Sequence, residues 1–331
     1  MSNIKSIDFS KYQIPLKNRF ETALRSITEF DVFQLKVNLL SGETLIGEVV
    51  VTPVITQISE DTLRADVENI LIPTFENFDL KDPNDFYELL QLKLPNNPTA
   101  RALGDLTQYS FKNSSKSLVV KTDVTIPISQ GIELEKLVKL RLEEGFNSLK
   151  IKLNQDTLSN NIEKMKILND LTPQECAIRI DPNQSWDTIY SLEFLERTNS
   201  LGIQIEYLEQ PIHRSDISGL AFIRRNTNTE IMADEACFDL KDLRKIIDLE
   251  AADWVNIKIL KAGGVTPAKK LAEEVLRNNL KLSFGCMIES PIGVGAAMSL
   301  AHQYAPNQTH DLDAAWWYFQ KELNYESGSI S

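Results

Sequence analysis

The chain has 331 residues, of which 42% are hydrophobic and 25% charged, as is typical of a folded globular protein with a sizeable core. Its formal net charge of -12 leaves no basic surplus to neutralise phosphates, which argues against a nucleic-acid-binding protein. The sequence contains no apolar stretch approaching the roughly 18 residues of a membrane span, and its start lacks the apolar region of a signal peptide. We therefore expect a cytoplasmic protein that acts on a small molecule, with no nucleic acid and no membrane as partner.

The first 118 residues are predicted to form an α+β domain. Alternating apolar residues indicate antiparallel strands over 6–16, 31–40 and 43–51, and "SGE" at 41–43 is typical of a hairpin turn. Helical patterns follow at about 62–77, 83–93 and 97–112.

Residues 119–331 show a different rhythm, in which short apolar runs alternate with amphipathic helical segments about every 25 residues. This alternation indicates βαβ units and a parallel sheet. The eight predicted strands lie at 123–128, 148–153, 177–183, 205–211, 230–235, 254–260, 282–287 and 310–315. Eight strands favour a closed (β/α) barrel over an open sheet, and no GxGxxG or phosphate-loop motif supports the open alternative.

Polar side chains fall at the carboxyl ends of these strands, where the chemistry of such barrels takes place. They are Lys150, Lys152, Asp181, Glu209, Asp234, Lys258, Asp311 and Asp313. Taken singly, each has an ordinary structural explanation, because a strand-end aspartate is often a helix N-cap and a lysine often extends to solvent. Their joint occurrence along successive strands is much harder to explain in that way.

Three of them, Asp181, Glu209 and Asp234, are carboxylates that end the third, fourth and fifth strands. An all-oxygen set of this kind suits Mg²⁺ and leaves coordination positions for water or substrate oxygens. We predict that these side chains converge on one octahedral Mg²⁺ site.

Lys150 and Lys152 are two residues apart in "SLKIKL", so both side chains project from the same face of a strand. The second and sixth strands of an eight-stranded barrel lie opposite each other, which sets Lys152 across from Lys258. Two amines on opposite sides of a substrate suit the removal of a proton next to a carboxylate and its return to the other face, with a metal stabilising the enediolate between. Because a neighbouring ammonium and desolvation lower a lysine pKa, we expect Lys150 to tune Lys152 as a base and to reach a substrate oxygen.

The chain resembles the enolase superfamily, in its muconate-lactonizing-enzyme-like subgroup, in five motifs: "KIK" at 150–152, "DPN" at 181–183, "EQP" at 209–211, "ADE" at 233–235 and "NIK" at 256–258. The resemblance covers nearly the whole chain. It implies an α/β fold, a (β/α)7β modified TIM barrel with an N-terminal capping domain, together with Mg²⁺ and proton abstraction next to a carboxylate. Members similar to mandelate racemase use a histidine base from a later strand. The histidines here, at 213, 302 and 310, do not end the sixth or seventh strand, so the lysine pair is the consistent interpretation.

Two further features resemble the dipeptide epimerases of this subgroup. "DLD" at 311–313 is similar to the Asp-x-Asp that holds the substrate's α-ammonium group; a strand-end turn of solvated acids is the alternative. "RFETALRS" at 19–26 resembles the capping loop that closes on the substrate side chain. Arg25 matches the arginine that binds the distal glutamyl carboxylate in that loop, and an exposed arginine without a role is the alternative.

The "GCMIES" stretch at 285–290 matches the motif of the seventh strand in these relatives. This implies substrate contacts around Met287 and Ile288, and Thr125 on the first strand is a further substrate-binding candidate. We interpret Glu289 as a polar residue at the rim. The capping domain and the C-terminus look shorter than in relatives, which bears on specificity more than on chemistry.

The leading hypothesis is an Mg²⁺-dependent dipeptide epimerase that inverts the α-carbon of the C-terminal residue, with L-Ala-D/L-Glu from murein recycling as the best substrate. An o-succinylbenzoate synthase-like lyase or a cycloisomerase would use the same lysines but does not require an acid pair for an ammonium group. A non-catalytic relative is disfavoured because every expected ligand and base is present. A homo-oligomer stays open.

Overall fold

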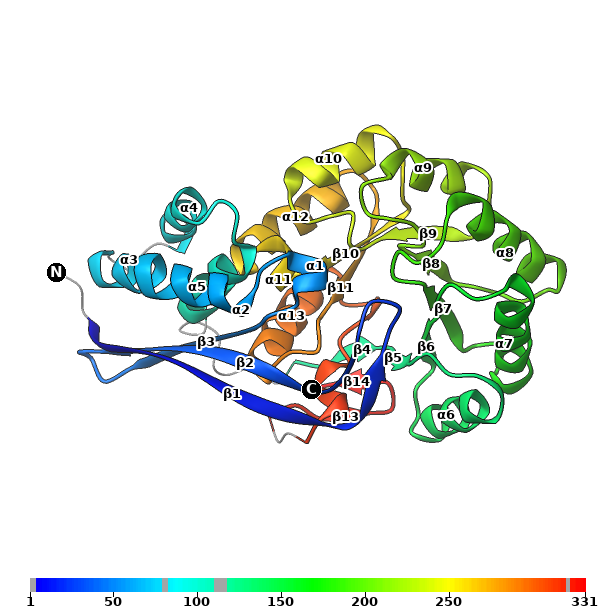
Figure 1. Cartoon of the computed structure of the whole chain (residues 1–331), viewed down its shortest axis with the longest axis horizontal. Helices are drawn as coiled ribbons and strands as arrows, with labels where there is room; N and C mark the ends of the chain where they lie inside the picture. Colours follow the sequence, from blue (N-terminus) through cyan, green and yellow to red (C-terminus); the bar gives the residue numbers. More distant parts are fainter. Residues whose placement is uncertain (1–3, 79–82, 110–117, 320–321) are drawn as a thin grey trace.

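The computed structural model describes residues 4–78, 83–109, 118–319 and 322–331 (Figure 1). It begins with an antiparallel sheet of β1 (Ile4–Glu21), β2 (Ser26–Leu39) and β3 (Thr44–Val50). Buried apolar residues alternate with more exposed ones along much of β2, as the sequence pattern predicted. The chain turns between β2 and β3 at Gly42, whose φ of 93° favours a residue without a Cβ.

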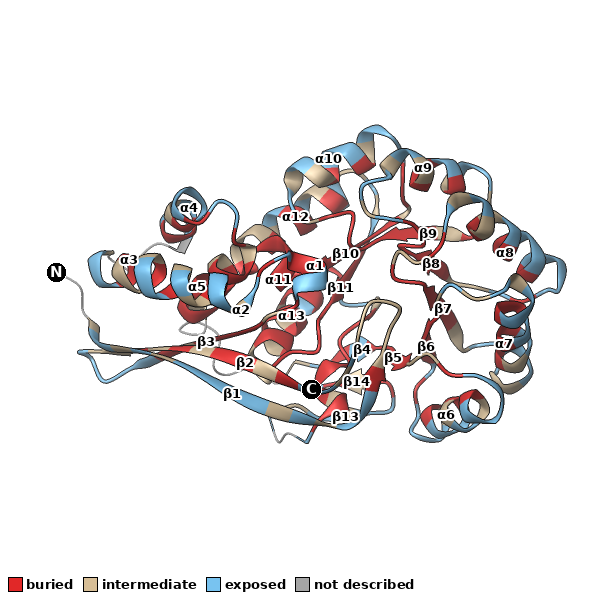
Figure 2. Ribbon diagram, viewed as in Figure 1, coloured by how far each residue is buried: buried red, intermediate tan, exposed pale blue. Residues whose placement is uncertain are grey.

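Helices follow this sheet in the chain, and all but α1 lie together near one end of it (Figure 1). They are α1 (Pro53–Thr56), α2 (Glu60–Asp66), a π-helical turn (Val67–Leu71), α3 (Ile72–Asn77), α4 (Pro83–Lys93) and α5 (Pro98–Tyr109). The three predicted helices are confirmed, although residues 110–112 of the last one lie outside the described residues. Helix α5 is buried along most of its length, because it lies between the sheet and the rest of the molecule (Figure 2). A Cβ at Gly47 of β3 would come within 2.7 Å of the Leu103 carbonyl, so this close approach requires glycine.

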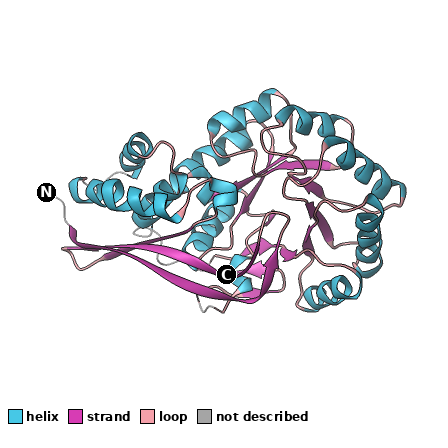
Figure 3. Ribbon diagram, in the orientation of Figure 1, coloured by secondary structure: helices cyan, strands magenta, loops and turns pink. Residues whose placement is uncertain are grey.

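Strands and helices alternate from residue 120 onward (Figure 3). The strands are β4 (Val120–Thr122), β5 (Val124–Ile126), β6 (Ser148–Lys152), β7 (Ala177–Asp181), β8 (Tyr207–Glu209), β9 (Glu230–Ala233), β10 (Trp254–Lys258), β11 (Lys281–Gly285) and β12 (Thr309–His310). The helices are α6 (Gly131–Glu143), α7 (Leu158–Leu171), α8 (Thr188–Ser200), α9 (Ile217–Arg225), α10 (Leu240–Asp248), α11 (Ile259–Ala262), α12 (Val265–Arg277) and α13 (Pro291–Tyr304). Each of the eight strands predicted for this part overlaps one of these observed strands, although β11 begins one residue earlier than predicted and β12 shares only His310 with the predicted range 310–315.

The parallel strands close into a barrel through β12. Seven of them form one curved sheet in the order β11-β10-β9-β8-β7-β6-β5. On one side, β12 pairs with β4, and the Asp123 N–H before β5 donates to the His310 carbonyl. On the other side, Asp311, which follows β12, donates its N–H to the Phe284 carbonyl and accepts the Cys286 N–H. These bonds join the last strand to both edges of the sheet, and the predicted (β/α)7β barrel with an N-terminal α+β region is confirmed.

The N-terminal region is attached to the barrel by a helix cap supplied from another element. Helix α12 begins after Gly264, which has a φ of 139° and no side chain to cap the helix. Asp105 of α5 supplies the cap, since its carboxylate accepts hydrogen bonds from the Thr266 N–H at 2.8 Å and the Thr266 hydroxyl at 2.7 Å. A Cβ at Gly264 would lie 2.6 Å from Asp105 Oδ2, so glycine also makes room for this carboxylate.

The last residues return to the barrel. A 3₁₀ turn (Ala314–Trp317) is followed by β13 (Tyr325–Glu326) and β14 (Ser329–Ile330), and β14 pairs with β4. The predicted domain boundary at residue 118 adjoins residues outside the described part and stays a prediction. Within the described residues, no helix is long and apolar enough to cross a membrane.

Candidate active site

Charged side chains meet at the carboxyl ends of the parallel strands. Lys150 and Lys152 belong to β6, Asp181 ends β7, Glu209 ends β8, Asp234 follows β9 and Lys258 ends β10. All six are buried, with Lys258 the most exposed at 7%. Because charged groups are buried only when they are paired, their contacts describe the site.

The two lysines of β6 share one carboxylate oxygen. Lys152 Nζ lies 2.5 Å from Asp181 Oδ2, and Lys150 Nζ lies 3.2 Å from the same atom. Lys150 also lies 2.8 Å from Glu209 Oε2 and 2.8 Å from Asp311 Oδ2. Burial acts to lower the pKa of Lys150, but Asp311, Glu209 and Asp181 outweigh it and raise this pKa well above its usual value.

Asp234 is held from two sides by lysines. Lys258 Nζ lies 2.7 Å from Asp234 Oδ2, and Lys261 Nζ lies 2.6 Å from Asp234 Oδ1. Lys261 also donates to the carbonyl oxygens of Asp234 and Asn256. Burial raises the pKa of Asp234, but Lys258 and Lys261 outweigh burial, so this carboxyl stays ionised well below its usual range.

The other carboxyl groups respond differently to the same burial. Burial raises the pKa of Glu209 to about 8 although Lys150 opposes it. Burial, together with the charges of Asp234 and Asp181, raises the pKa of Glu235 to about 7. Lys152 and Lys150 overcome the burial of Asp181 and lower its pKa. Burial therefore favours the neutral forms of Glu209 and Glu235, and a cation nearby would favour their charged forms.

The donor set fits Mg²⁺ in its chemistry. Asp181, Glu209 and Asp234 provide buried carboxylate oxygens from three neighbouring strands, the hard ligands that Mg²⁺ prefers. Glu209 Oε2 and Asp234 Oδ1 contact only ammonium groups and accept no hydrogen bond of good geometry within the described residues. No group of three or more His, Cys, Asp or Glu side chains in that part of the chain is already arranged around a metal position, because the lysines take up the carboxylate oxygens.

Asp311 and Asp313 follow β12, and both line a pocket at the ends of the parallel strands. Asp311 pairs with Lys150, as described above. Asp313 Oδ2 accepts hydrogen bonds from the Thr125 N–H at 2.7 Å and from Trp317 Nε1 at 3.0 Å. The structure thus brings Thr125 and the "DLD" acids together, and the acids are buried rather than solvated.

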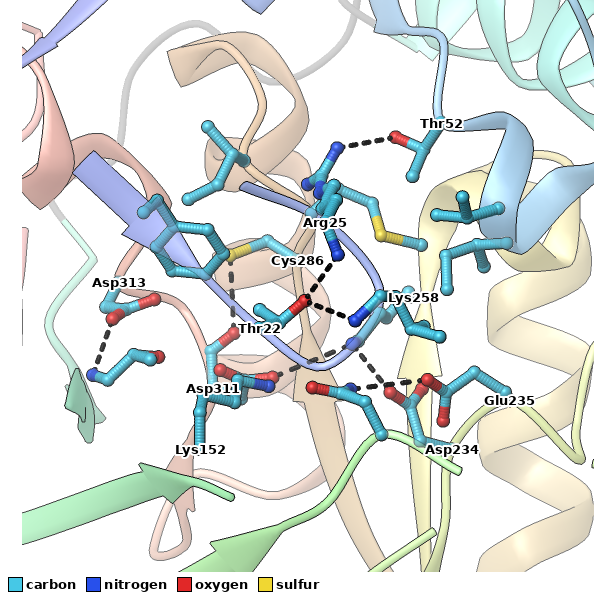
Figure 4. A pocket seen from close by; sticks show the side chains of 18 residues that line it. Thr22, Arg25, Thr52, Lys152, Asp234, Glu235, Lys258, Cys286, Asp311 and Asp313 are labelled. Atoms are coloured by element: carbon cyan, nitrogen blue, oxygen red, sulfur yellow. Dashed lines mark hydrogen bonds and ion pairs between the residues drawn. The ribbon is translucent and has the colours of Figure 1, made fainter. Parts of the chain in front are cut away.

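One pocket joins the strand ends to the N-terminal loops (Figure 4). Arg25 and Thr52 lie on one side of it, and Lys152, Asp234 and Asp311 lie on the other. Arg25 Nη1 donates to the Thr52 hydroxyl at 3.4 Å, and within the described residues no carboxylate lies within ion-pair distance of this guanidinium. Burial lowers the pKa of Arg25 to about 10. A partly buried cation without an anion is available to a ligand.

The segment after β11 also reaches the pocket, but one prediction about it is wrong. Met287 and Ile288 line the pocket, and their contact with a substrate stays a prediction. Glu289 is not a rim residue, because its side chain is 2% exposed and its carboxylate accepts the Met287 N–H at 2.9 Å. Burial raises the pKa of Glu289 to about 7.

Several neighbours of the predicted residues were missed. Asn183 donates to Asp181 and Glu235, and Asn256 donates to Glu209 and, more weakly, to Asp311. Asn183, Glu235 and Asn256 stand within the "DPN", "ADE" and "NIK" motifs, so a signal for them was present. Lys261 resembles an ordinary surface lysine in the sequence and gave no such signal.

A family model described as enolase C-terminal domain-like matches residues 133–331. A curated relative, the L-Ala-D/L-Glu epimerase of Francisella tularensis subsp. novicida (strain U112), is 31% identical over 315 residues, which cover 91% of this chain and 87% of the relative. The chain belongs to the enolase C-terminal domain-like family. The resemblance inferred from the five motifs is thereby confirmed.

Solved structures of this family agree with the fold. A substrate-liganded complex of the L-Ala-D/L-Glu epimerase from Bacillus subtilis has a TM-score of 0.92 at 26% identity, over 99% of this chain and 96% of that chain. A dipeptide epimerase from Enterococcus faecalis V583, complexed with Mg and the dipeptide L-Leu-L-Tyr, has a TM-score of 0.90 at 25% identity, with the same coverage.

Proposed function

We propose that this protein is an Mg²⁺-dependent dipeptide epimerase that inverts the α-carbon of the C-terminal residue. The observation that carries the proposal is the pair Lys152 and Lys258, which approach one pocket from β6 and β10, with three carboxylates at the ends of the strands between them. One amine removes the α-proton from the face it meets, and the other delivers a proton to the opposite face. The two lysines exchange roles when the other epimer binds.

Asp181, Glu209 and Asp234 are the residues that would hold the cation. When bound, Mg²⁺ supplies positive charge next to the substrate carboxylate and so favours loss of the α-proton. Lys150 is fully buried between the carboxylates of Glu209 and Asp311, so its contribution to the site passes through these two acids. Burial and the ammonium of Lys150 act to lower the pKa of Lys258, but Asp234 and Asp311 outweigh them and raise this pKa.

The two ends of the pocket suit the two ends of a dipeptide with an acidic C-terminal residue. Asp311 and Asp313 offer carboxylates to the α-ammonium group. Arg25 offers a guanidinium that has no carboxylate partner in the described residues, which suits the side-chain carboxylate of a glutamyl residue. We therefore propose L-Ala-D/L-Glu as the substrate, the chemistry named for the relatives in Francisella and Bacillus, with murein-peptide recycling as the setting.

A lyase or cycloisomerase would use the same lysines for elimination. It has no use for an acid pair at the ammonium end of the pocket, whereas Asp311 and Asp313 both line that pocket. The relatives named above are epimerases, which also supports the epimerase over this alternative.

The test is proton exchange at the α-carbon in D₂O, followed by NMR with Mg²⁺ across a library of dipeptides. We expect exchange and inversion at the C-terminal residue, strongest for Ala-Glu. A library without exchange at any α-carbon would contradict the proposal. Elimination products from a succinylated or lactone substrate would favour the lyase or cycloisomerase.

A further inference from the structure

Arg214 connects the barrel to the N-terminal region at the edge of the pocket. It lies in the loop between β8 and α9, and its guanidinium Nη1 donates a hydrogen bond of 2.9 Å to the backbone carbonyl of Ile55 in α1. Helix α1 has only four residues, so its last carbonyls need donors from outside the helix. A cationic donor at a helix C-terminus is a favourable partner for such a carbonyl.

The barrel holds Arg214 in a defined position. The Arg214 N–H donates to the Gln184 side-chain oxygen at 2.9 Å, and the Gln184 N–H donates to the Gln210 carbonyl at 2.8 Å. The guanidinium carbon of Arg214 lies 5.2 Å from the centre of the Phe238 ring. Since Gln210 directly follows Glu209, the position of Arg214 is linked to the strand ends that carry the site.

The acceptor of the Arg214 hydrogen bond, Ile55, belongs to the wall of the pocket. Thr52, Val54 and Ile55 all line the pocket, and Thr52 is the residue before α1. The Thr52 hydroxyl accepts the hydrogen bond from Arg25. The short segment 52–55 therefore accepts hydrogen bonds from two arginines, from Arg25 at Thr52 and from Arg214 at Ile55.

We propose that Arg214 is a positioning residue that fixes α1 over the pocket and thereby sets the affinity for the substrate side chain. The substrate part of this inference rests on the proposed function, whereas the contact with α1 does not. Arg214 takes no part in proton transfer, because it acts through α1 and Arg25. Its loss should raise KM and leave kcat nearly unchanged.

The test compares Arg214→Met with Arg224→Met. Methionine keeps much of the apolar stem against Phe238 but removes the donor to Ile55. Arg224 is a matched control, because it pairs with Asp253 at 2.8 Å and donates to the Glu250 carbonyl at 3.0 Å within the barrel. For Ala-Glu we expect Arg214→Met to raise KM about tenfold, the smaller end of the range for a hydrogen bond to a charged group, with kcat within about twofold. Arg214→Lys, which keeps a cationic donor, should recover part of this loss, and Arg224→Met should leave KM unchanged.

Hydrogen exchange of the substrate-free protein measures the contact directly. Arg214→Met should speed exchange of the amides of Ile55, Thr56 and Gln57, which bond to Thr52 and Pro53, while the barrel strands stay protected. Unchanged exchange in this segment, or equal KM changes in both variants, would overturn the proposal. If the wild type exchanges no dipeptide α-proton, the proposed function fails, and faster exchange at α1 would still support the positioning by Arg214.

Discussion

Lys152 and Lys258 hold different carboxylates on opposite sides of one pocket. Strands β7, β8 and β9 separate β6 from β10 in the sheet. Lys152 Nζ lies 2.5 Å from Asp181 Oδ2, and Lys258 Nζ lies 2.7 Å from Asp234 Oδ2. In the described residues the two amines share no carboxylate, so each is held by its own acid, an arrangement that fits two opposed bases.

The first prediction separates the roles of these lysines. Lys152→Ala should abolish α-proton exchange from one epimer while Lys258 still exchanges the other, and Lys258→Ala should show the mirror pattern. Both variants should lose net epimerisation, since inversion needs a proton donor on the far face. The measurement is α-hydrogen exchange by NMR in D₂O for each epimer separately.

Two further lysine variants serve as references for this experiment. Lys150→Ala should weaken exchange in both directions, because Lys150 contacts Asp181, Glu209 and Asp311 rather than one face of the pocket. Lys164→Met removes a buried lysine that pairs with Asp156 outside the site and should leave both directions intact. Near-full epimerisation in either Lys152→Ala or Lys258→Ala would rule out two opposed bases.

The second prediction concerns the cation. Glu209→Gln keeps the shape of the side chain but removes a ligand charge. The Mg²⁺-dependent exchange of the substrate α-proton should therefore be abolished, while the far-UV circular dichroism spectrum stays unchanged. Titration calorimetry should detect Mg²⁺ binding to the wild type and much weaker binding to the variant. Equal Mg²⁺ affinity in the two proteins would show that Glu209 is not a ligand.

The third prediction concerns Arg25. Arg25→Ala should cost about 1.5–3 kcal/mol in kcat/KM for dipeptides with an acidic second residue, the range for a hydrogen bond to a charged group. Dipeptides with an apolar second residue should lose much less. Arg19→Ala is the matched control, because this arginine of β1 is exposed and donates to Ser26 outside the pocket. Equal losses for acidic and apolar substrates would exclude a role for Arg25 in recognising the side chain.

The sequence predicted most of the barrel and the polar strand ends, for a physical reason. Buried parallel strands are nearly continuous apolar runs, and the charged residues that interrupt them, such as Lys150 and Asp181, stand out. The prediction for Glu289 was wrong because a carboxyl group can be buried when it accepts a local hydrogen bond. Here the donor is the Met287 N–H, and composition does not indicate such a bond. The contacts of Arg214 with Ile55 and of Asp105 with Thr266 join residues 159 and 161 positions apart, and no local pattern predicts such pairs.

The last prediction uses Asp105, which caps α12 from α5. Burial raises the pKa of Asp105 from 3.8 to about 6, although the hydrogen bonds from Thr266 oppose the shift. Between these two values the folded state binds more protons at this site than the unfolded chain does. The free energy of unfolding therefore falls as pH rises from about 4 to about 6, by an amount on the order of 3 kcal/mol for this group.

Asp105→Asn removes the titration but keeps a side chain of the same shape that can bond to Thr266. At pH 4 its stability should be close to that of the wild type, whose carboxyl is then mostly protonated in the fold. By pH 7 the variant should be the more stable protein, and urea unfolding across this pH range measures the difference. Thr266→Val removes the hydroxyl that lowers the pKa of Asp105, so it should move the pH-dependent loss of stability to higher pH. A difference between Asp105→Asn and wild type that stays constant from pH 4 to pH 7 would mean that Asp105 does not titrate in this range, and that it caps α12 as an ion throughout.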